Sequence, residues 1–188
     1  MIRSGRDDRL RIVTLAISET IMAKKLFLYS TDAATGDTQK MFKNKGYEVV
    51  ALTKDPAFFW KQIDKIEDKG FLAIMSHGDD NGFLMVDGTS GKDMTDTEID
   101  TFGTTLQKRG ITLYLLSCHT GRDPFCAKLL KTHCRFAAPI GYAEVKSTSQ
   151  SLSVYSVTDP KAVKVEYPGW GGDPDLCPRR AASALNIL

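Results

Sequence analysis

Two stretches of the sequence decide the fold: FLAIMSHGDD at residues 71–80 and ITLYLLSCHTG at residues 111–121. Each begins with an apolar run of strand length and ends in a short polar string that holds a histidine or a cysteine. Such runs are typical of strands buried on both faces of a parallel sheet. Because reactive groups collect at the carboxyl ends of such strands, the two stretches predict one site at one edge of the sheet.

Strand and helix patterns alternate outward from these stretches. Further strands are predicted at residues 26–29, 47–52, 83–86 and 136–140, and helices at 33–45, 55–70, 95–110 and from 123 onward. Repeated strand–helix units indicate an α/β fold with a mostly parallel central sheet and helices on both faces. After residue 143 the pattern weakens into a polar loop at 146–153, short strands at 154–157 and 163–165, and an irregular tail at 168–178.

The second predicted helix illustrates the boundary signals. Asp55-Pro56 supplies a capping residue followed by a proline in the first turn. Phe59, Ile63 and Ile66 then fall on one face, and Gly70 is expected to end the helix.

Size and composition limit the classes of protein. The chain has 188 residues, of which 42% are hydrophobic and 26% charged, and a net charge of +2. This length suits one domain, predicted at 22–188, with residues 1–21 as an N-terminal extension outside the fold and the start left open between Met1 and Met22. The weak charge and short apolar runs predict neither a nucleic acid nor a membrane as a partner. A cytoplasmic location is the default expectation.

The four cysteines are Cys118, Cys126, Cys134 and Cys177, and none forms a CxxC pair. A chain of this size without a secretion signal is expected to keep them as free thiols. Their spacing to the neighbouring histidines lacks the close ligand pairs of zinc sites, so we expect no metal. No cofactor is implied.

A thiol and an imidazole at one sheet edge can perform nucleophilic catalysis. His77 can take the proton of the Cys118 thiol and later protonate a leaving amine. The backbone amides of Gly78 and Cys118 can hold the oxyanion. His119, in extended backbone, should point away from Cys118 and serve the structure of the loop. The alternative for Cys118 is a buried structural thiol.

The strings SHGDD at 76–80 and LLSCHTG at 115–121 resemble the two catalytic motifs of the caspase-like superfamily, which includes metacaspases, gingipain-type proteases and CHAT domains. The resemblance covers residues 24–143. The 41 residues between His77 and Cys118 are close to the roughly 50 known for caspases. The resemblance implies a three-layer sandwich in which Cys118 is the nucleophile and His77 its partner. The caspase string QACxG is absent, and Leu116 stands where metacaspases carry an acidic residue.

The predicted function is therefore a cysteine endopeptidase with a Cys–His dyad, acting on a protein or peptide substrate. By analogy with the superfamily, it would serve regulated processing together with a separate regulatory protein. Asp79, Asp80 and Glu144 are candidates for binding a basic substrate side chain. Two alternatives stay open: a non-catalytic binding module of the same fold, and a hydrolase that uses Cys118 on a small molecule.

Overall fold

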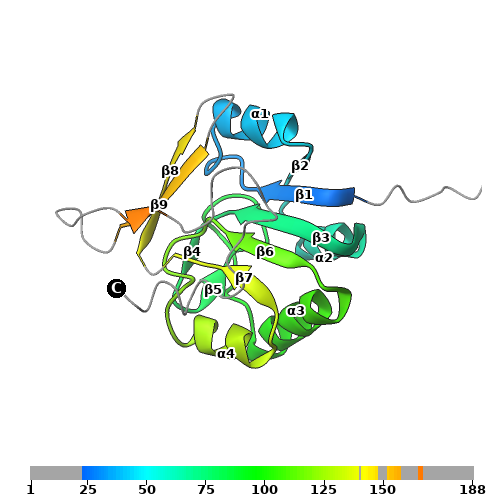
Figure 1. Cartoon of the computed structure of the whole chain (residues 1–188). Coiled ribbons are helices and arrows are strands. Elements are labelled where there is room, and N and C mark those ends of the chain that lie inside the picture. Colours follow the sequence, from blue (N-terminus) through cyan, green and yellow to red (C-terminus); the bar gives the residue numbers. More distant parts are fainter. Residues whose placement is uncertain (1–22, 140, 148–151, 158–164, 167–188) are drawn as a thin grey trace, which may run out of the picture.

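The computed structural model describes residues 23–139, 141–147, 152–157 and 165–166, with side chains described for 23–139 and 141–143 (Figure 1). The predicted N-terminal extension, the irregular tail and Cys177 lie outside the described residues. The helices are α1 (Gly36–Asn44), α2 (Pro56–Asp64), α3 (Asp96–Arg109) and α4 (Phe125–Lys131). The strands are β1 (Ala23–Tyr29), β2 (Glu48–Ala51), β3 (Ile66–Met75), β4 (Gly78–Asp79), β5 (Gly82–Phe83), β6 (Thr112–Leu115), β7 (Arg135–Ala137), β8 (Tyr142–Ser147), β9 (Leu152–Val157) and β10 (Val165–Glu166).

Five strands form the central sheet in the order β2-β1-β3-β6-β7, and all four pairings are parallel. This confirms the predicted α/β fold with a parallel central sheet. The order places β1 beside β3 at the point where the winding of the sheet reverses direction. Open α/β sheets bind their ligands in the crevice at this switch point, outside the carboxyl ends of the strands.

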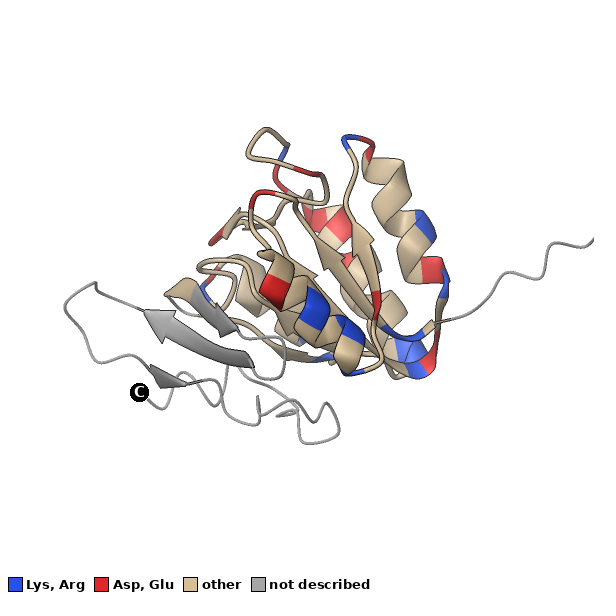
Figure 2. Ribbon diagram, turned by 90° about the horizontal axis from the view of Figure 1, so that it is seen from above, with Lys and Arg blue, Asp and Glu red and all other residues tan. Residues whose placement is uncertain are grey.

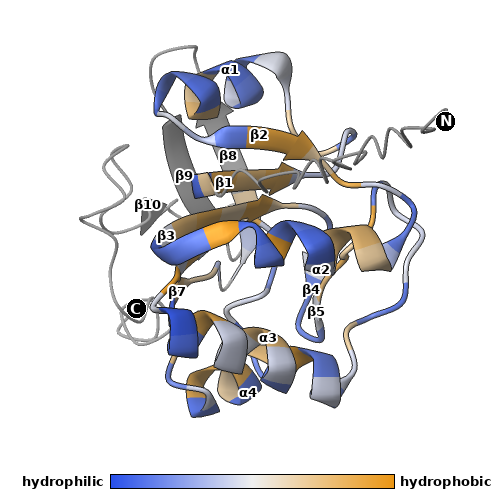
Figure 3. Ribbon diagram, turned by 90° about the vertical axis from the view of Figure 1, so that its right-hand side faces the viewer, coloured by the Kyte–Doolittle hydropathy of each residue, from blue (hydrophilic) through white to orange (hydrophobic). Residues whose placement is uncertain are grey.

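Alternate residues along each central strand enter two separate cores. Leu26, Leu72 and Leu113 belong to the core that is shared with α2, α3 and α4. Phe27 and Ala73 belong to the opposite core, which is shared with α1. Both faces therefore carry helices, with α2, α3 and α4 on one side and α1 on the other, and Figure 3 shows apolar strands between helices with polar outer faces. On the α1 side, β8 lies next to that helix (Figure 1).

The starts of α2 and α3 follow the sequence signals, whereas α4, predicted from 123 onward, begins at Phe125 without a side-chain cap. Thr95 and Glu98 form a reciprocal capping box at the start of α3. The Asp55 carboxylate accepts the N–H of Ala57 at 2.9 Å, with Pro56 as the first residue of α2, as predicted.

The predicted extent of α2 is wrong. The helix ends at Asp64, and Ile66 starts β3, where it pairs with Ala23 of β1. Two residues later on β1, Lys25 pairs with Phe71, five residues later on β3, so β3 bulges between these pairs. Ile66 is fully buried, which explains why it fitted the apolar face of a helix equally well.

Three other predicted boundaries also differ. The strand predicted at 83–86 is reduced to β5, which pairs only with β4 in a two-stranded hairpin. The strand predicted at 136–140 ends at Ala137. Residues 146–147 and 152–153 of the predicted polar loop belong to β8 and β9, which form an antiparallel hairpin. That loop was predicted from polarity alone, but strand pairing needs only backbone groups.

Gly103 of α3 packs against Thr132, the residue that follows α4. A Cβ atom on Gly103 would overlap the side chain of Thr132. Gly103→Ala gains about 0.5–1 kcal/mol of helix propensity but overpacks this contact, which costs about 1–3 kcal/mol. We expect a net loss of about 1–2 kcal/mol in urea unfolding. Gly36→Ala is the matched control, because nothing lies within 4 Å of its added Cβ. Equal stability of the two variants would contradict the close packing.

No helix within the described ranges is both long enough and apolar enough to span a membrane.

Candidate active site

His77 and Cys118 occupy equivalent positions past the ends of two paired strands. Ile74 of β3 is in register with Leu115 of β6, and the two candidate residues each follow three positions later. The pairing continues beyond the sheet, because Leu116 donates its N–H to the Ile74 carbonyl at 2.8 Å. Ser76 and Ser117 are buried, and their hydroxyl oxygens lie 3.3 Å apart. Since neighbouring strands run about 4.8 Å apart, this register places both residues at the same edge of the sheet.

Packing between the loops fixes this arrangement. A Cβ atom on Gly78 would lie 2.9 Å from Cβ of Ser117 and 3.1 Å from Cγ2 of Thr120. Glycine is thus required at this position for the loop after β3 to pack against the loop after β6. The Phe125 N–H at the start of α4 donates to the Asp80 carbonyl at 3.0 Å, which ties the β4–β5 hairpin to the same loop.

Cys118 differs from the other described thiols. It is partly exposed, whereas Cys126 and Cys134 are buried. Burial raises the pKa of the Cys126 thiol to about 12 and that of Cys134 to about 11, so both stay protonated at neutral pH. Among the described cysteines, Cys118 is therefore the one that solvent and a substrate can reach.

The contact with Asp32 was missed by the sequence reasoning. Nε2 of His77 lies 3.1 Å from Oδ2 of Asp32, and both side chains are a little over 40% exposed. Asp32 follows β1, which neighbours β3 across the switch point. The signal that could have found it is the polar string Ser30-Thr31-Asp32 directly after an apolar strand. The contact occupies Nε2, so Nδ1 is the ring nitrogen that a reacting group could use.

Hydrogen bonding keeps Asp32 ionised. The bond from the Ser30 hydroxyl is the main cause that lowers the pKa of the Asp32 carboxyl, and the contact with His77 acts in the same direction. Desolvation opposes these effects without reversing them.

The hairpin leaves one of the two predicted oxyanion donors unused. Leu84 donates its N–H to the His77 carbonyl at 2.9 Å, which makes Gly78 and Phe83 a non-hydrogen-bonded pair. The Gly78 N–H therefore takes no part in this ladder. Such an N–H, beside the Cys118 loop, is the type of group that stabilises an oxyanion.

The conformation expected for His119 is wrong, although the ring does pack against the loop structure. Its φ of 59° is left-handed and not extended. Its N–H donates to the Gly141 carbonyl at 2.8 Å, and its ring meets the ring of Tyr142 edge-on, with centroids 4.4 Å apart. The chain turns sharply directly after Cys118, and the Tyr142 contact holds the His119 imidazole.

The candidate substrate carboxylates lie in different places. Asp79 lines a pocket of about 210 Å³ together with His77 and Asp93. The Asp79 carboxylate also accepts the N–H of Asn81 at 2.7 Å, and Asp80 is exposed in the same hairpin turn. Glu144 lies in β8, opposite Tyr155 of β9, and its side chain is outside the description.

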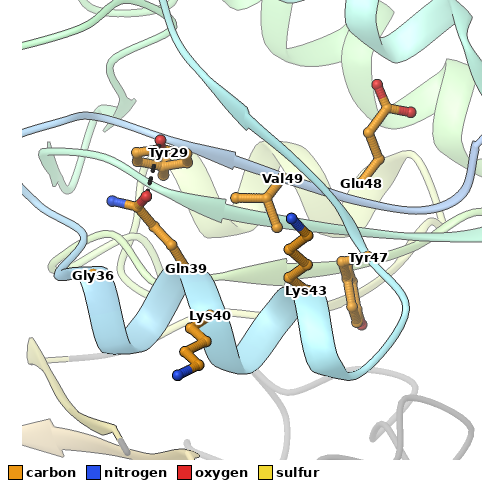
Figure 4. A pocket seen from close by; sticks show the side chains of 8 residues that line it. All are labelled: Tyr29, Gly36, Gln39, Lys40, Lys43, Tyr47, Glu48 and Val49. Atoms are coloured by element: carbon orange, nitrogen blue, oxygen red, sulfur yellow. Dashed lines mark hydrogen bonds between the residues drawn. The ribbon is translucent and has the colours of Figure 1, made fainter. Parts of the chain in front are cut away.

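A larger pocket of about 560 Å³ lies between α1 and the β1–β2 edge (Figure 4). Tyr29, Gln39, Lys40, Lys43 and Tyr47 are among its lining residues, and Tyr29 donates its hydroxyl to Gln39 Oε1 at 3.2 Å. Neither His77 nor Cys118 lines it, so it is separate from the candidate dyad. In the described part of the chain, no group of three or more His, Cys, Asp or Glu side chains is arranged to hold a metal ion.

Comparisons with known proteins identify no family. No family model and no curated protein match the chain. One of the solved structures that match is an aromatic-amino-acid aminotransferase from Burkholderia pseudomallei, covalently bound to pyridoxal phosphate. It is 14% identical, with a TM-score of 0.39 over 61% of this chain and 30% of that one. The chain thus spans less than a third of that enzyme, and a likeness this distant says nothing about function.

Proposed function

We propose that the protein is a cysteine endopeptidase of the caspase-like superfamily, with Cys118 as nucleophile and His77 as acid and base. The observation that carries the proposal is the strand register. Ile74 and Leu115 are paired, and His77 and Cys118 each follow three residues after one of them. The order of elements also agrees with the sequence resemblance: β3, His77-Gly78, the β4–β5 hairpin, α3, β6 and Cys118.

The residues can carry out the complete reaction. His77 accepts the thiol proton, and the Cys118 sulfur forms a bond to the scissile carbonyl carbon. The carbon–nitrogen bond then breaks, and the imidazolium returns the proton to the leaving amine. Water, deprotonated by His77, hydrolyses the thioester and releases the thiol. The amides of Gly78 and Cys118 would hold the carbonyl oxygen in both steps, where one such donor contributes about 10²–10³-fold to the rate.

A peptide-library cleavage profile of the purified protein tests the proposal. We expect cleavage at defined peptide bonds and covalent capture of Cys118 by an electrophilic peptide probe. A protein that neither cleaves any peptide nor reacts with the probe would be the non-catalytic binding module. Reaction with small electrophilic esters alone would favour the small-molecule hydrolase.

Charge at the carboxyl edge predicts the substrate class. The loops there carry Asp32, Asp79, Asp80, Asp87 and Asp93, against Lys54, Lys92 and Arg122. Figure 2 shows acidic residues on several loops of the molecule. A pocket of about 210 Å³ is smaller than a typical ligand pocket and suits one side chain. Because acidic surroundings favour a cation, we expect cleavage after Arg or Lys.

Substitutions then identify the carboxylate that binds the basic substrate side chain. Asp79→Asn and Asp93→Asn should each lower kcat/KM for Arg relative to Ala by about 10-fold or more, since a hydrogen bond to a charged group contributes about 1.5–3 kcal/mol. Asp80→Asn and Glu144→Gln test the other two sequence candidates in the same assay. A profile dominated by Asp before the cleaved bond would refute the acidic pocket.

A further inference from the structure

Ser30 is a fully buried serine that joins three groups at the end of β1. Its hydroxyl oxygen lies 2.5 Å from Oδ1 of Asp32 and 3.1 Å from Oδ1 of Asp87, and it accepts the N–H of Gly88 at 2.7 Å. A hydroxyl has one proton to donate, and the nearer carboxylate is that of Asp32. The donor to Asp32 is therefore held in place by a backbone group from a different loop.

Asp87 connects the loop that holds Gly88 to the end of β1. Its Oδ1 accepts the backbone N–H of Thr31 at 2.7 Å and the Thr31 hydroxyl at 2.8 Å. Its own N–H donates to the Thr53 carbonyl at 2.9 Å, and Lys54 donates to its carbonyl at 2.6 Å. Asp87 thus connects the ends of β1 and β2, and it fixes the turn that presents Asp32.

We infer that Asp32 is a positioning residue for His77, with Ser30 and Asp87 as its support, so that the dyad works as a Cys–His–Asp arrangement. The inference rests on the proposed function, because it assigns a role within the same site. A carboxylate that accepts Nε2–H fixes the tautomer whose Nδ1 carries the lone pair, and that lone pair takes the Cys118 proton. The same carboxylate stabilises the imidazolium that forms.

The contact is poorly explained as a stabilising surface pair. Exposed ion pairs add little to stability, because two long side chains must be ordered in water. Here one partner is ordered in advance by a fully buried hydroxyl, as expected of a group that orients a reacting side chain.

Asp32→Asn is the sharpest variant. The asparagine oxygen can still accept from Ser30, but its NH₂ then faces Nε2 and favours the tautomer with the proton on Nδ1. We expect kcat to fall about 10²-fold with KM within about threefold, a smaller loss than for a buried aspartate because water reaches this pair. Asp64→Asn, an exposed carboxylate at the end of α2, is the matched control.

A second measurement needs no substrate. The rate of Cys118 alkylation by iodoacetamide is followed against pH in a Cys177→Ser background, where the buried Cys126 and Cys134 react slowly. Asp32→Asn should slow alkylation at pH 7, because the thiol proton then has a poorer acceptor. Ser30→Ala should slow alkylation by a smaller amount, and thermal melting verifies that each variant is folded.

The outcomes separate the two claims. If His77→Ala slows alkylation while Asp32→Asn behaves like Asp64→Asn, the positioning role is overturned and the dyad stands. If His77→Ala leaves alkylation unchanged, His77 is not the partner of Cys118. The proposed function is then refuted, together with the role of Asp32. A fall in kcat for Asp32→Asn without any change in the alkylation profile would also overturn the positioning role, because tautomer control acts on the thiol.

Discussion

Cys118→Ala is expected to reduce peptide cleavage by about 10⁶-fold, the size of loss found when the nucleophile of a nucleophile–base unit is removed. The reason is chemical, since Cys118 is the only thiol among the described residues of the sheet edge that can form the thioester. Cys118 is partly exposed, so losing its sulfur leaves no large cavity, and the melting temperature should change little. The measurement is kcat/KM on the best peptide of the library profile.

Two buried cysteines are the controls. Cys126→Ala and Cys134→Ala remove thiols that burial keeps protonated, and they should retain most of the activity. Each substitution should lower the free energy of unfolding by about 1–2 kcal/mol, because both side chains are packed in the core shared with α2, α3 and α4. Equal loss of activity in Cys126→Ala and Cys118→Ala would count against Cys118 as the nucleophile.

The sheet could be predicted because its strands are buried on both faces. FLAIM and ITLYLL are apolar without interruption, and such runs have few other places in a folded protein. The start of β3 could not be predicted from local pattern. Ile66 fits a helix face with Phe59 and Ile63, and only its pairing with Ala23, far away in the sequence, makes it a strand residue.

The candidate site likewise combines features that a local sequence pattern predicts with features that depend on long-range pairing. The position of His77 and Cys118 at one sheet edge could be predicted, because each comes two or three residues after its own apolar strand. The polar string after β1 marks the position of Asp32 but not its partner, because the contact with His77, 45 residues away, depends on β1 lying beside β3. The link between Thr31 and Asp87 likewise spans 56 residues and joins two loops with no common sequence signal. Long-range strand order, which a one-dimensional pattern does not contain, assembles the support of the site.

His77→Ala should lower kcat/KM by about 10⁴-fold or more, since the variant has neither a base for the thiol nor an acid for the leaving amine. His119→Ala is the matched control, because it removes a neighbouring imidazole from the same edge.

The His119 ring packs on Tyr142 with centroids 4.4 Å apart, and an aromatic pair contributes about 0.5–1.5 kcal/mol. Even if all of this were lost from the transition state, the rate would fall by only about tenfold. A leaving group of low basicity adds a further distinction, because it needs no proton: such an ester should recover part of the activity of His77→Ala and give no comparable gain in His119→Ala. If His119→Ala showed the larger loss, the assignment of the base from strand register would be wrong, and the imidazole beside Tyr142 would have to turn toward the thiol.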